Sequence, residues 1–495
     1  MTGSAQNVPG SVRYASFALV LIAALALFAT RASAPHNFLD KDQERPASYI
    51  LDAVNNGHWV CQTDWMGDIT SKPPLLTWVG AGIATIAGGV SALVLYLPSA
   101  LAMTLLALLI WRFGNHYFGA VAAAFAGIIL LLSPLSMRLF ILLRTDSVFA
   151  LMVGLTAFAA YRASTRGKGW TLFWLLAALA TLTKGPLGLL LGAGGLLVVP
   201  WERNSADKPS LKGNHLAGIL LYIALTLGWF FLAYLQFGDA LVDKIIRREL
   251  VAHAVNIGEA DPIYERFFKP AIYYIHRVLP WSLVAFAAFW RVLRQPSTDP
   301  DERRFERFLF CWFFVGLGVF SVTQHQRGDL LAPILAPAAL LAGRELATWL
   351  RRLRPAHALA VAAAAATLSV GYGYYYYHHD EAENPLVVDT MHLKHFADSI
   401  RAQTGPDYPF IYTDCYYTFQ LYMGSMRTNV TFESAADTLA SEHPAFTVTS
   451  ESAAETIQRL AESRGATVYL IDQCRGESGT LATILGNRPS LPETR

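Results

Sequence analysis

The sequence is divided into apolar runs long enough to cross a membrane, and short loops between them carry most of the basic residues. A helix needs roughly 20 mainly apolar residues to span a bilayer. Hydrophobic residues make up 54% of the 495-residue chain and charged residues only 15%, against roughly 45–50% and 25% in soluble proteins. The mean hydropathy of +0.34 agrees with this. The pattern predicts a mainly α polytopic membrane protein and argues against a soluble globular fold.

Arg and Lys in the short loops set the expected orientation, because cytoplasmic loops are enriched in both. Four such loops, at residues 162–168, 203–212, 291–307 and 344–354, are therefore expected in the cytoplasm. The net charge of +2 and the lack of a basic patch interleaved with aromatic residues give no indication of nucleic-acid binding. About eleven to thirteen spans are expected, and the eleven assigned are residues 15–32, 92–111, 119–135, 147–163, 170–184, 187–201, 215–236, 277–292, 306–323, 329–347 and 356–374.

This orientation sends four polar stretches to the outer side of the membrane. They are the long loop 33–91, the loops 136–146 and 238–276, and the short loop around residues 324–329. Most candidate site residues fall in these stretches or at the ends of the spans beside them. An active site is therefore expected at the outer face.

The composition changes after Val370, where "GYGYYYYHHDEAENP" marks the exit from the membrane. Its tyrosines are typical of an interfacial aromatic belt. Beyond it, short apolar runs alternate with helical patterns, which predicts a small α/β domain. The predicted strands are residues 408–413, 445–449 and 466–472, with a helix over 453–463. The expected organisation is a transmembrane domain at 1–376 that includes the loop 33–91, and a periplasmic accessory domain at 385–495.

The cysteines and histidines give little sign of a metal site. Cys61, Cys311, Cys415 and Cys474 have no zinc spacing. The sequence leaves open a disulfide between Cys415 and Cys474, which fall in segments expected outside the cytoplasm, where disulfides persist. The His-His-Asp run at 378–380 is interpreted as a solvated turn. We therefore assign no metal ligands and no cofactor, although a requirement for a divalent metal is left open.

The long outer loop carries the residues best suited to chemistry. Asp42, Glu44 and Arg45 follow the first span closely, and Lys72 precedes two prolines and an apolar run. A carboxylate at the membrane surface can act as a general base, and Arg or Lys can hold a phosphate by charge-assisted hydrogen bonds. Ordinary solvated charges would give the same composition. A second charged turn, Arg144-Thr145-Asp146, opens the span at 147–163, where a charge at the membrane edge is costly and usually functional.

The order of these motifs resembles the GT-C integral-membrane glycosyltransferases, in particular the lipid A aminoarabinose transferases and the protein-mannosyltransferase-like group. In that family the first outer loop reads D-E-x-R-Y, then G-D-W, then E-K-P-P-L. Here "DQER", "GHW" and "SKPPL" occupy these places, in the segments 42–45, 57–59 and 71–75. Further matches are "RTDS", "TLTKGPLGLLL", "KPAIYYIHRVLPW" and "VFSVTQHQRGDLLAPILAP", so that the resemblance covers residues 15–345.

The resemblance implies an inverting transfer of a sugar from a polyprenyl-phosphate donor to a glycolipid or glycan acceptor, such as lipid A. Asp42 would be the base or would orient the acceptor, and Asp146 would be a second carboxylate of the site. Membrane lipid would surround the enzyme. The implied phosphate- or donor-binding residues are Arg45, Lys72, Arg247, Arg248 and Arg327, and the implied acceptor or cavity residues are Glu44, Arg144, Lys184 and His325.

Departures from the family pattern leave alternatives. Ser71 replaces the usual acid before Lys-Pro-Pro, Pro46 replaces the usual Tyr after the first Arg, and the later Lys position is shifted to 325–329. Asp146 could instead cap the following helix, and Arg247 and Arg248 could pair with Glu249. The competing functions are a transporter of lipid-linked sugars and an inactive protein that binds them. Because transporters often show inverted repeats and mid-depth charges, and neither is evident here, an enzyme is favoured.

Overall fold

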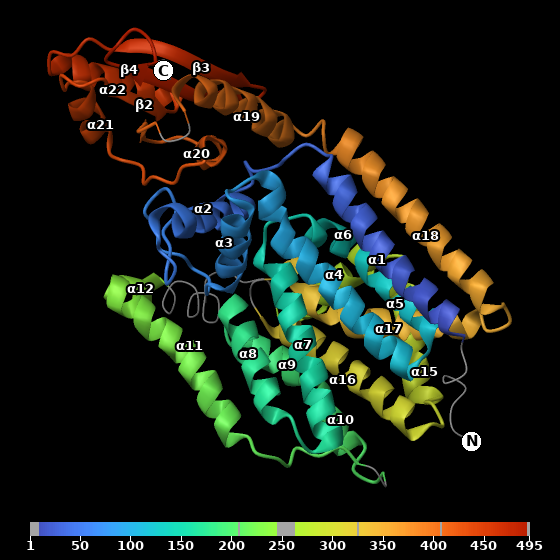
Figure 1. Cartoon of the computed structure of the whole chain (residues 1–495). Helices are drawn as coiled ribbons and strands as arrows, with labels where there is room; N and C mark the ends of the chain where they lie inside the picture. The colour runs from blue at the N-terminus through green and yellow to red at the C-terminus, as the bar shows by residue number, and fades with distance from the viewer. Residues whose placement is uncertain (1–8, 206–207, 245–262, 324–325, 406–407, 493–495) are drawn as a thin grey trace. The chain divides into compact units, whose positions relative to one another are not determined.

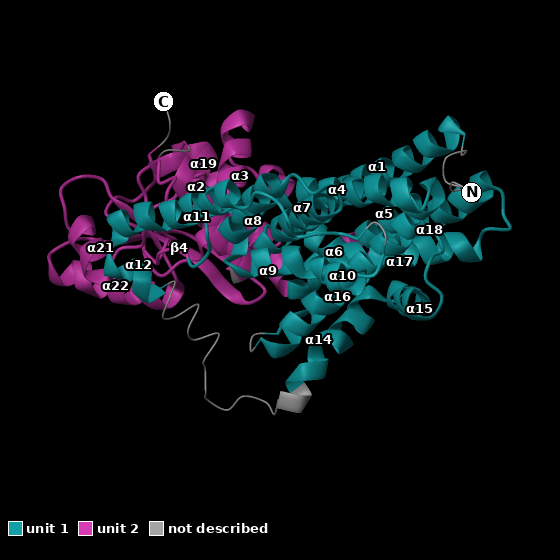
Figure 2. Cartoon of the chain, turned by 90° about the horizontal axis from the view of Figure 1, so that it is seen from below, with its two compact units in different colours: residues 1–32, 71–76, 98–374 teal, residues 33–70, 77–97, 375–495 magenta. Residues whose placement is uncertain are grey.

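The computed structural model describes residues 9–205, 208–244, 263–323, 326–405 and 408–492. The chain divides into two compact units (Figure 2). Unit 1 contains residues 1–32, 71–76 and 98–374, and unit 2 contains residues 33–70, 77–97 and 375–495. The break after residue 374 lies beside the predicted end of the transmembrane domain. The predicted outer loop 33–91 belongs mostly to unit 2, together with the C-terminal residues, so the units are discontinuous in sequence.

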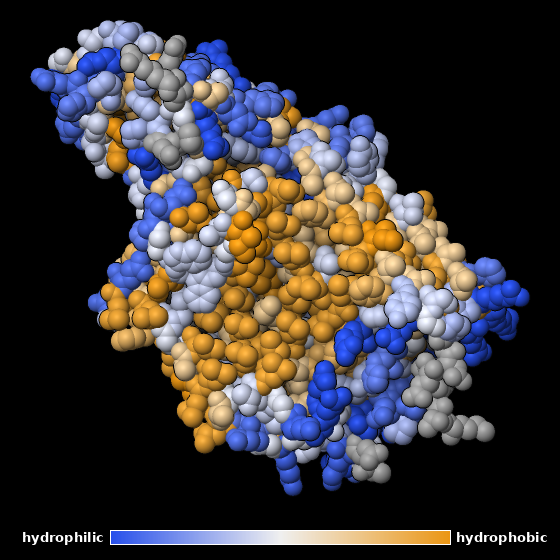
Figure 3. Space-filling view, in the orientation of Figure 1, coloured by the Kyte–Doolittle hydropathy of each residue, from blue (hydrophilic) through white to orange (hydrophobic). Residues whose placement is uncertain are grey.

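Unit 1 is helical throughout its described residues (Figure 1). Side chains seen over its helices in Figure 3 are mainly hydrophobic, as expected of a surface that meets lipid. Its elements are α1 (Gly10–Ala32), α4 (Ala92–Tyr117, which begins in unit 2), α5 (Ala120–Leu132), α6 (Pro134–Phe140), α7 (Thr145–Arg166), α8 (Trp170–Lys184), α9 (Leu187–Ala193), η2 (Gly194–Leu197), α10 (Val198–Trp201), α11 (Leu216–Phe237), α12 (Asp239–Val242), α14 (Ile263–Val278), α15 (Trp281–Arg294), α16 (Pro300–Val322), η4 (Gly328–Leu331), α17 (Ala332–Trp349) and α18 (Pro355–Tyr375).

The helices confirm a mainly α polytopic membrane protein, with a span count that differs from the expected eleven. Among the described residues, seven helices are long and apolar enough to cross a membrane, or nine if each of two bent helix pairs is one span. The bent pairs are α5 with α6, at 67°, and α14 with α15, at 119°. The predicted spans 170–184 and 187–201 are shorter apolar helices. Each predicted span therefore has a helical counterpart, but the sequence analysis did not predict the two bends.

The break between α5 and α6 follows directly from the sequence. Proline has no backbone N–H, so it cannot continue a helix but suits the first position of a new one. Pro134 occupies that first position in α6, and the Ser133 side chain accepts a hydrogen bond from the Ser136 N–H as the N-cap. Residues 119–135 are thus one apolar run in sequence but two helices in space.

Helix α17 lies at the centre of unit 1, packed against α5, α7, α15 and α16. The contact with α5 is close because the facing residues are small. A Cβ atom added to Gly343 would lie 2.6 Å from the Ala122 carbonyl oxygen and 2.6 Å from the Ala126 nitrogen. Since real side chains cannot approach the backbone so closely, glycine is required there. Small residues of this kind are typical of helix contacts in membranes.

Charged side chains gather near the end of α17, in the loops predicted to be cytoplasmic. Arg307 Nη1 lies 2.7 Å from Glu202 Oε1, Arg291 Nε lies 2.8 Å from Glu345 Oε2, and Arg344 pairs with Glu306. A second group of charges, described below, includes Asp329 just before α17. The rise of a helix puts about 20 Å between Asp329 and Arg344. The apolar middle of α17 between the two groups suits the hydrocarbon layer of a membrane.

Unit 2 contains helices from residues 33–97 and from residues 375–495. It also contains one mixed sheet of order β1-β2-β4-β3. Strand β1 pairs with β2 in parallel, and β4 is antiparallel to both β2 and β3, with Val448 opposite Ile484. The elements are α2 (Lys41–Asn56), α3 (Leu75–Ala87, which begins in unit 1), η5 (Tyr376–Asp380), α19 (Pro385–Thr404), β1 (Ile411–Tyr412), α20 (Tyr417–Met423), α21 (Phe432–Leu439), β2 (Phe446–Thr449), α22 (Glu451–Ser463), β3 (Tyr469–Gly476) and β4 (Gly479–Gly486).

The sheet confirms the predicted α/β character of the C-terminal residues and adds strand β4, which the sequence analysis missed. A tertiary contact holds the turn between β3 and β4. The buried Asp389 carboxylate accepts hydrogen bonds from the Glu477 N–H at 2.6 Å and the Ser478 N–H at 3.2 Å. The hairpin thus depends on α19, which is distant in sequence, and local pattern alone does not reveal it.

The disulfide that the sequence left open is not formed. Cys415 and Cys474 are both free and buried, as is Cys61. Burial raises the pKa of the Cys474 thiol to about 11 and that of Cys61 to about 12, and it also raises the pKa of Cys415. Each of these three thiols is therefore protonated at neutral pH.

These three thiols are expected to resist iodoacetamide at pH 8 while the protein is folded, because the thiolate is the reactive form. With a pKa of about 11, only about 0.1% of Cys474 is ionised at pH 8. Mass spectrometry after labelling, with and without denaturant, measures this. Raising the pH should speed labelling of Cys474 before that of Cys61. If Cys415 and Cys474 stayed unlabelled in denaturant until a reductant was added, they would be a disulfide instead.

Candidate functional site

A chain of alternating charges is buried in unit 1 near the start of α7. Lys184, at the end of α8, places its Nζ 2.5 Å from Asp146 Oδ1. The other oxygen of Asp146, Oδ2, lies 3.2 Å from Arg144 Nε. Asp146 is only 3% exposed, so both of its carboxylate oxygens are committed to buried cations. An arrangement of this kind holds the two cations in fixed positions.

The chain of charges continues through Arg144 to a second buried carboxylate. Arg144 Nη1 lies 2.8 Å from Asp329 Oδ2, and Asp329 Oδ1 lies 3.2 Å from Arg277 Nη1. Arg144 and Asp329 are 9% and 4% exposed, whereas Arg277 is 39% exposed. The order of residues is therefore Lys184, Asp146, Arg144, Asp329 and Arg277. Buried charges are costly unless they are paired and hydrogen-bonded, and here each acid serves two cations.

The two acids come from the same local pattern, Arg-x-Asp at the start of an apolar helix. Arg144 and Arg327 both have extended backbone, with φ −142° and −132°, and neither side chain caps the helix that follows. Asp146 and Asp329 then lie in the first turn of α7 and η4. Asp146 is thus not the N-cap of α7, which removes one alternative reading. Negative charge in a first helical turn is also favoured by the helix dipole.

Two further cations lie close enough for their charges to act on this chain. The charge of Lys72 acts on Lys184, and the charge of Arg327 acts on Asp146. We call the seven side chains together the cationic cluster. They carry five positive and two negative charges, a net charge of +3. The members of the cationic cluster are Lys72, Arg144, Asp146, Lys184, Arg277, Arg327 and Asp329.

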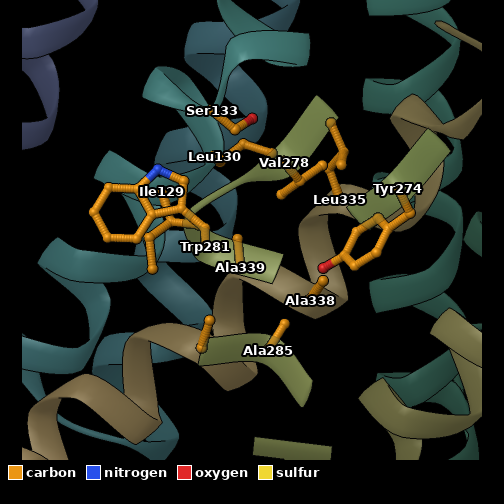
Figure 4. Close-up of a pocket in the computed structure, with 11 residues that line it drawn as sticks. Ile129, Leu130, Ser133, Tyr274, Val278, Trp281, Ala285, Leu335, Ala338 and Ala339 are labelled. Carbon is orange, nitrogen blue, oxygen red and sulfur yellow. The ribbon is translucent and has the colours of Figure 1, made fainter. Parts of the chain in front are cut away.

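A small apolar pocket, with a cavity volume of about 10 Å³, lies between α5, α14, α15 and α17. Val278, which directly follows Arg277, lines it together with Trp281, Ala338 and Ala339 (Figure 4). Tyr274 directs its hydroxyl into this pocket, and among the described residues that oxygen has no hydrogen-bond partner. The lining suits hydrocarbon and offers no charged group to a sugar or phosphate.

Unit 2 holds the predicted residues of the first outer loop. Helix α2 begins after Asp40, whose Oδ1 accepts a hydrogen bond from the Asp42 N–H at 3.0 Å. Asp42, in the first turn of α2, is half-buried. Glu44 is buried, and its Oε1 accepts hydrogen bonds from the N–H and the hydroxyl of Thr418. Arg45 is half exposed, with its Nε 3.5 Å from Asp64 Oδ2.

These contacts show that Glu44 holds two helices of unit 2 together. It links α2 to α20 by accepting hydrogen bonds from the backbone N–H and the hydroxyl of Thr418. Burial raises the pKa of Asp64, the partner of Arg45. Asp64 also accepts hydrogen bonds from the Met66 and Asp68 N–H groups, which shape the loop after α2. The role of Glu44 in acceptor binding therefore stays a prediction, beside a structural role that the contacts show.

The predicted site residues fall into three groups. Lys72, Arg144, Asp146, Lys184 and Arg327 come together in unit 1 as members of the cationic cluster. Asp42, Glu44 and Arg45 lie in unit 2. Arg247, Arg248 and His325 lie outside the described residues.

Sequence analysis gave no role to Asp329 or Arg277, which complete the cationic cluster. The signal for Asp329 was present, because "RGD" at 327–329 repeats the pattern of "RTD" at 144–146. Arg277 lies in the matched motif "KPAIYYIHRVLPW", but only the folded chain brings it beside Asp329. In the described part of the chain, no group of three or more His, Cys, Asp or Glu side chains could hold a metal ion. The chemistry this site offers is the binding of an anion by buried, pre-positioned cations.

Comparison with known proteins gives the same picture. Residues 71–229 match the family described as dolichyl-phosphate-mannose-protein mannosyltransferase. An uncharacterized protein of Aquifex aeolicus is 28% identical over 264 residues, which cover 52% of this chain and 55% of that protein. The undecaprenyl phosphate-alpha-4-amino-4-deoxy-L-arabinose arabinosyl transferase 1 of Sodalis glossinidius is 31% identical over 205 residues, 39% of this chain and 34% of that protein. The chain thus spans about half or less of these curated relatives.

The likeness in fold extends along the whole chain. The crystal structure of ArnT from Cupriavidus metallidurans bound to undecaprenyl phosphate superposes with a TM-score of 0.74 at 17% identity, covering 97% of this chain and 99% of that one. At this level of identity the match concerns the fold. In fold over its whole length, and in sequence over residues 71–229, the chain resembles the GT-C integral-membrane glycosyltransferases, as its motifs indicated.

Proposed function

We propose that the protein is a glycosyltransferase that moves a sugar from a polyprenyl-phosphate donor to a glycan or glycolipid acceptor of the cell envelope. The observation that carries the proposal is the cationic cluster, whose net charge of +3 suits a phosphate. The hydrophobic surface of unit 1 (Figure 3) supports a phosphate that is attached to hydrocarbon. Relatives named as undecaprenyl-phosphate aminoarabinose transferases support the same class of donor. Lipid A is the proposed acceptor, because the sequence motifs resemble those of the lipid A aminoarabinose transferases.

The proposed reaction is a single inverting displacement. An acceptor oxygen attacks the anomeric carbon of the donor sugar and forms the new C–O bond. The bond between that carbon and the phosphate oxygen breaks, and the polyprenyl phosphate leaves with the bonding electrons. If the acceptor is a hydroxyl group, its proton passes to the Asp42 carboxylate, which acts as general base. A phosphate acceptor is already ionised, and Asp42 then orients it.

The cations are proposed to act mainly in the transition state. The phosphate of the donor is a diester with one negative charge, and it gains a second as it leaves. Positive charge fixed in a site of low dielectric stabilises that developing charge more than it stabilises the ground state. Lys72, Lys184 and Arg327 are proposed to contact the phosphate, with Arg45, Arg247 and Arg248 as further candidates. Arg144 and Asp146 hold the cations in place.

The site is proposed to face the periplasm from the inner membrane of a bacterium. The basic loops at 162–168, 203–212, 291–307 and 344–354 support this orientation by the positive-inside rule. The cationic cluster forms at the other ends of the same helices, where polyprenyl-linked sugars would be presented. Unit 2, with its small sheet, would then lie on the periplasmic side.

The test is transfer of labelled sugar by purified protein in lipid nanodiscs. Radiolabelled undecaprenyl-phosphate sugars are supplied with an extract of envelope glycolipids, and the product is identified by mass. The wild-type protein should move label to an acceptor, and Lys72→Ala should reduce that transfer. Binding of the donor without any transfer would favour an inactive binding protein. Donor carried across the bilayer without chemistry would favour a transporter.

A further inference from the structure

We propose that Arg277 is a ligand of the carrier phosphate, and that Asp329 and Gly328 are the residues that position it. The inference rests on the proposed function and adds a residue to which the sequence analysis gave no role. The cations linked by ion pairs from Lys184 to Arg277 differ in how exposed they are. Lys184 and Arg144 are 16% and 9% exposed, whereas Arg277 is 39% exposed. Arg277 is thus the cation of that chain most accessible to a ligand.

The bonding of Arg277 leaves donors for an anion. A guanidinium group carries five N–H donors in a rigid fork that matches the geometry of phosphate. In the described part of the chain, Arg277 pairs with one acid, Asp329, through Nη1 alone. That single pairing uses one edge of the fork. Asp329 is in turn bound by Arg144 Nη1, so its carboxylate is fixed from the other side.

The stem of Arg277 is fixed as well. A Cβ atom added to Gly328 would lie 2.5 Å from Arg277 Cδ and 2.6 Å from Arg277 Nε. The arginine stem therefore lies directly against the Gly328 backbone, one residue before Asp329. With its stem on Gly328 and one nitrogen on Asp329, the guanidinium group is held before a ligand arrives, which limits the entropy lost on binding. The ring of Tyr273, 5.9 Å from Arg277 Cζ, adds a cation–π contact.

The position of Arg277 also fits a ligand that is both anionic and apolar. Val278 follows it in α14 and lines the apolar pocket, and Tyr274, one turn earlier, lines the same pocket. The helix that carries Arg277 also exposes the apolar side chains of Phe268 and Ile272. These suit a phosphate attached to hydrocarbon better than a free phosphate, so the proposed ligand is the phosphate of a polyprenyl carrier.

The test compares binding of undecaprenyl phosphate, undecaprenol and phosphatidylglycerol by native mass spectrometry in detergent. Wild-type protein should prefer undecaprenyl phosphate to undecaprenol. Arg277→Gln should reduce that affinity about tenfold or more, the loss expected when a hydrogen bond between charged groups is removed, and Arg277→Lys should recover part of it. Arg294→Gln, which removes an exposed arginine of α15, is the matched control and should bind as wild type does.

A double-mutant cycle separates positioning from a general structural effect. Gly328→Ala removes no charge but pushes against the Arg277 stem, so it should weaken binding of undecaprenyl phosphate. In an Arg277→Ala background the stem is gone, and Gly328→Ala should then have no further effect, because the two changes act through one contact. Additive losses would overturn the positioning role. Thermal unfolding of each variant shows whether the protein remains folded.

The outcomes distinguish the two proposals. If wild-type protein binds undecaprenyl phosphate no better than undecaprenol, the proposed function fails. If it does prefer the phosphate but Arg277→Gln binds equally well, only the role of Arg277 is overturned. If Arg277→Gln weakens phosphatidylglycerol as much as undecaprenyl phosphate, Arg277 is a general lipid headgroup contact, and its assignment to the carrier is wrong.

Discussion

Replacing Asp146 with asparagine is expected to destabilise the protein by about 3–5 kcal/mol, the usual cost of removing one partner from a buried ion pair. Asp146 is 3% exposed and binds Arg144 through one oxygen and Lys184 through the other. An asparagine side chain has the same shape but no charge, so both cations would lose their buried counter-charge. A large fall in the unfolding temperature, measured in detergent, is the expected result. Sugar transfer should fall as well.

A double variant separates stability from activity at this site. Replacing a buried ion pair by apolar residues of similar volume is often neutral for stability. Asp146→Leu combined with Lys184→Met should therefore recover most of the lost stability, while Arg144 keeps its pairing with Asp329. Transfer should remain low, because Lys184 is proposed to bind the phosphate. If Asp146→Asn unfolds at the wild-type temperature, Asp146 is not the counter-ion described here.

Replacing Asp42 with asparagine is expected to leave the protein folded and to slow sugar transfer to a hydroxyl acceptor by about 10²–10⁴-fold, the usual contribution of a general base. Asp42 is half-buried in the first turn of α2. Its negative charge there stabilises α2 through the helix dipole by no more than about 1 kcal/mol. Removing that charge therefore has a small effect on stability. Rates of transfer with saturating donor, together with unfolding temperatures, measure both effects.

The neighbouring Asp40 provides the matched control. It is the N-cap of α2, and its side chain accepts the Asp42 N–H. Asparagine caps a helix about as well as aspartate, so Asp40→Asn removes a nearby negative charge without unfolding α2. It should transfer sugar at close to the wild-type rate. Equal losses from Asp40→Asn and Asp42→Asn would indicate a general charge effect, and an unchanged rate in Asp42→Asn would remove Asp42 from the reaction.

The membrane-spanning character of the chain could be predicted because it depends on composition and run length alone. Apolar runs such as 215–236 and 356–374 became α11 and α18 almost to the residue. The bend after Leu132 could have been predicted from Pro134. The 119° bend between α14 and α15 could not, because the packing of neighbouring helices fixes such an angle. Strand β4 was missed for a similar reason, since Asp389 of α19 holds its turn.

The candidate site was predictable where charge stands out against an apolar background. Asp146 was found because a charge at the end of an apolar span is costly and therefore conspicuous. Lys184 was found because "TLTKGPLGLLL" resembles a motif of the family. Their pairing, at 2.5 Å, was not found, because the two residues are 38 positions apart. Arg277 was missed because it lies on an amphipathic helix, where an arginine is unremarkable in sequence.

By itself, then, the sequence determined that this protein crosses a membrane many times, which ends of its helices carry charge, and which family it resembles. These properties follow from hydropathy and local motifs, which can be evaluated one segment of the sequence at a time. Only the tertiary structure decided which acid serves which cation, because ion pairs between helices depend on distances that sequence does not contain. It brought Arg144, Asp329 and Arg277 together across 185 positions and thereby joined scattered charges by ion pairs.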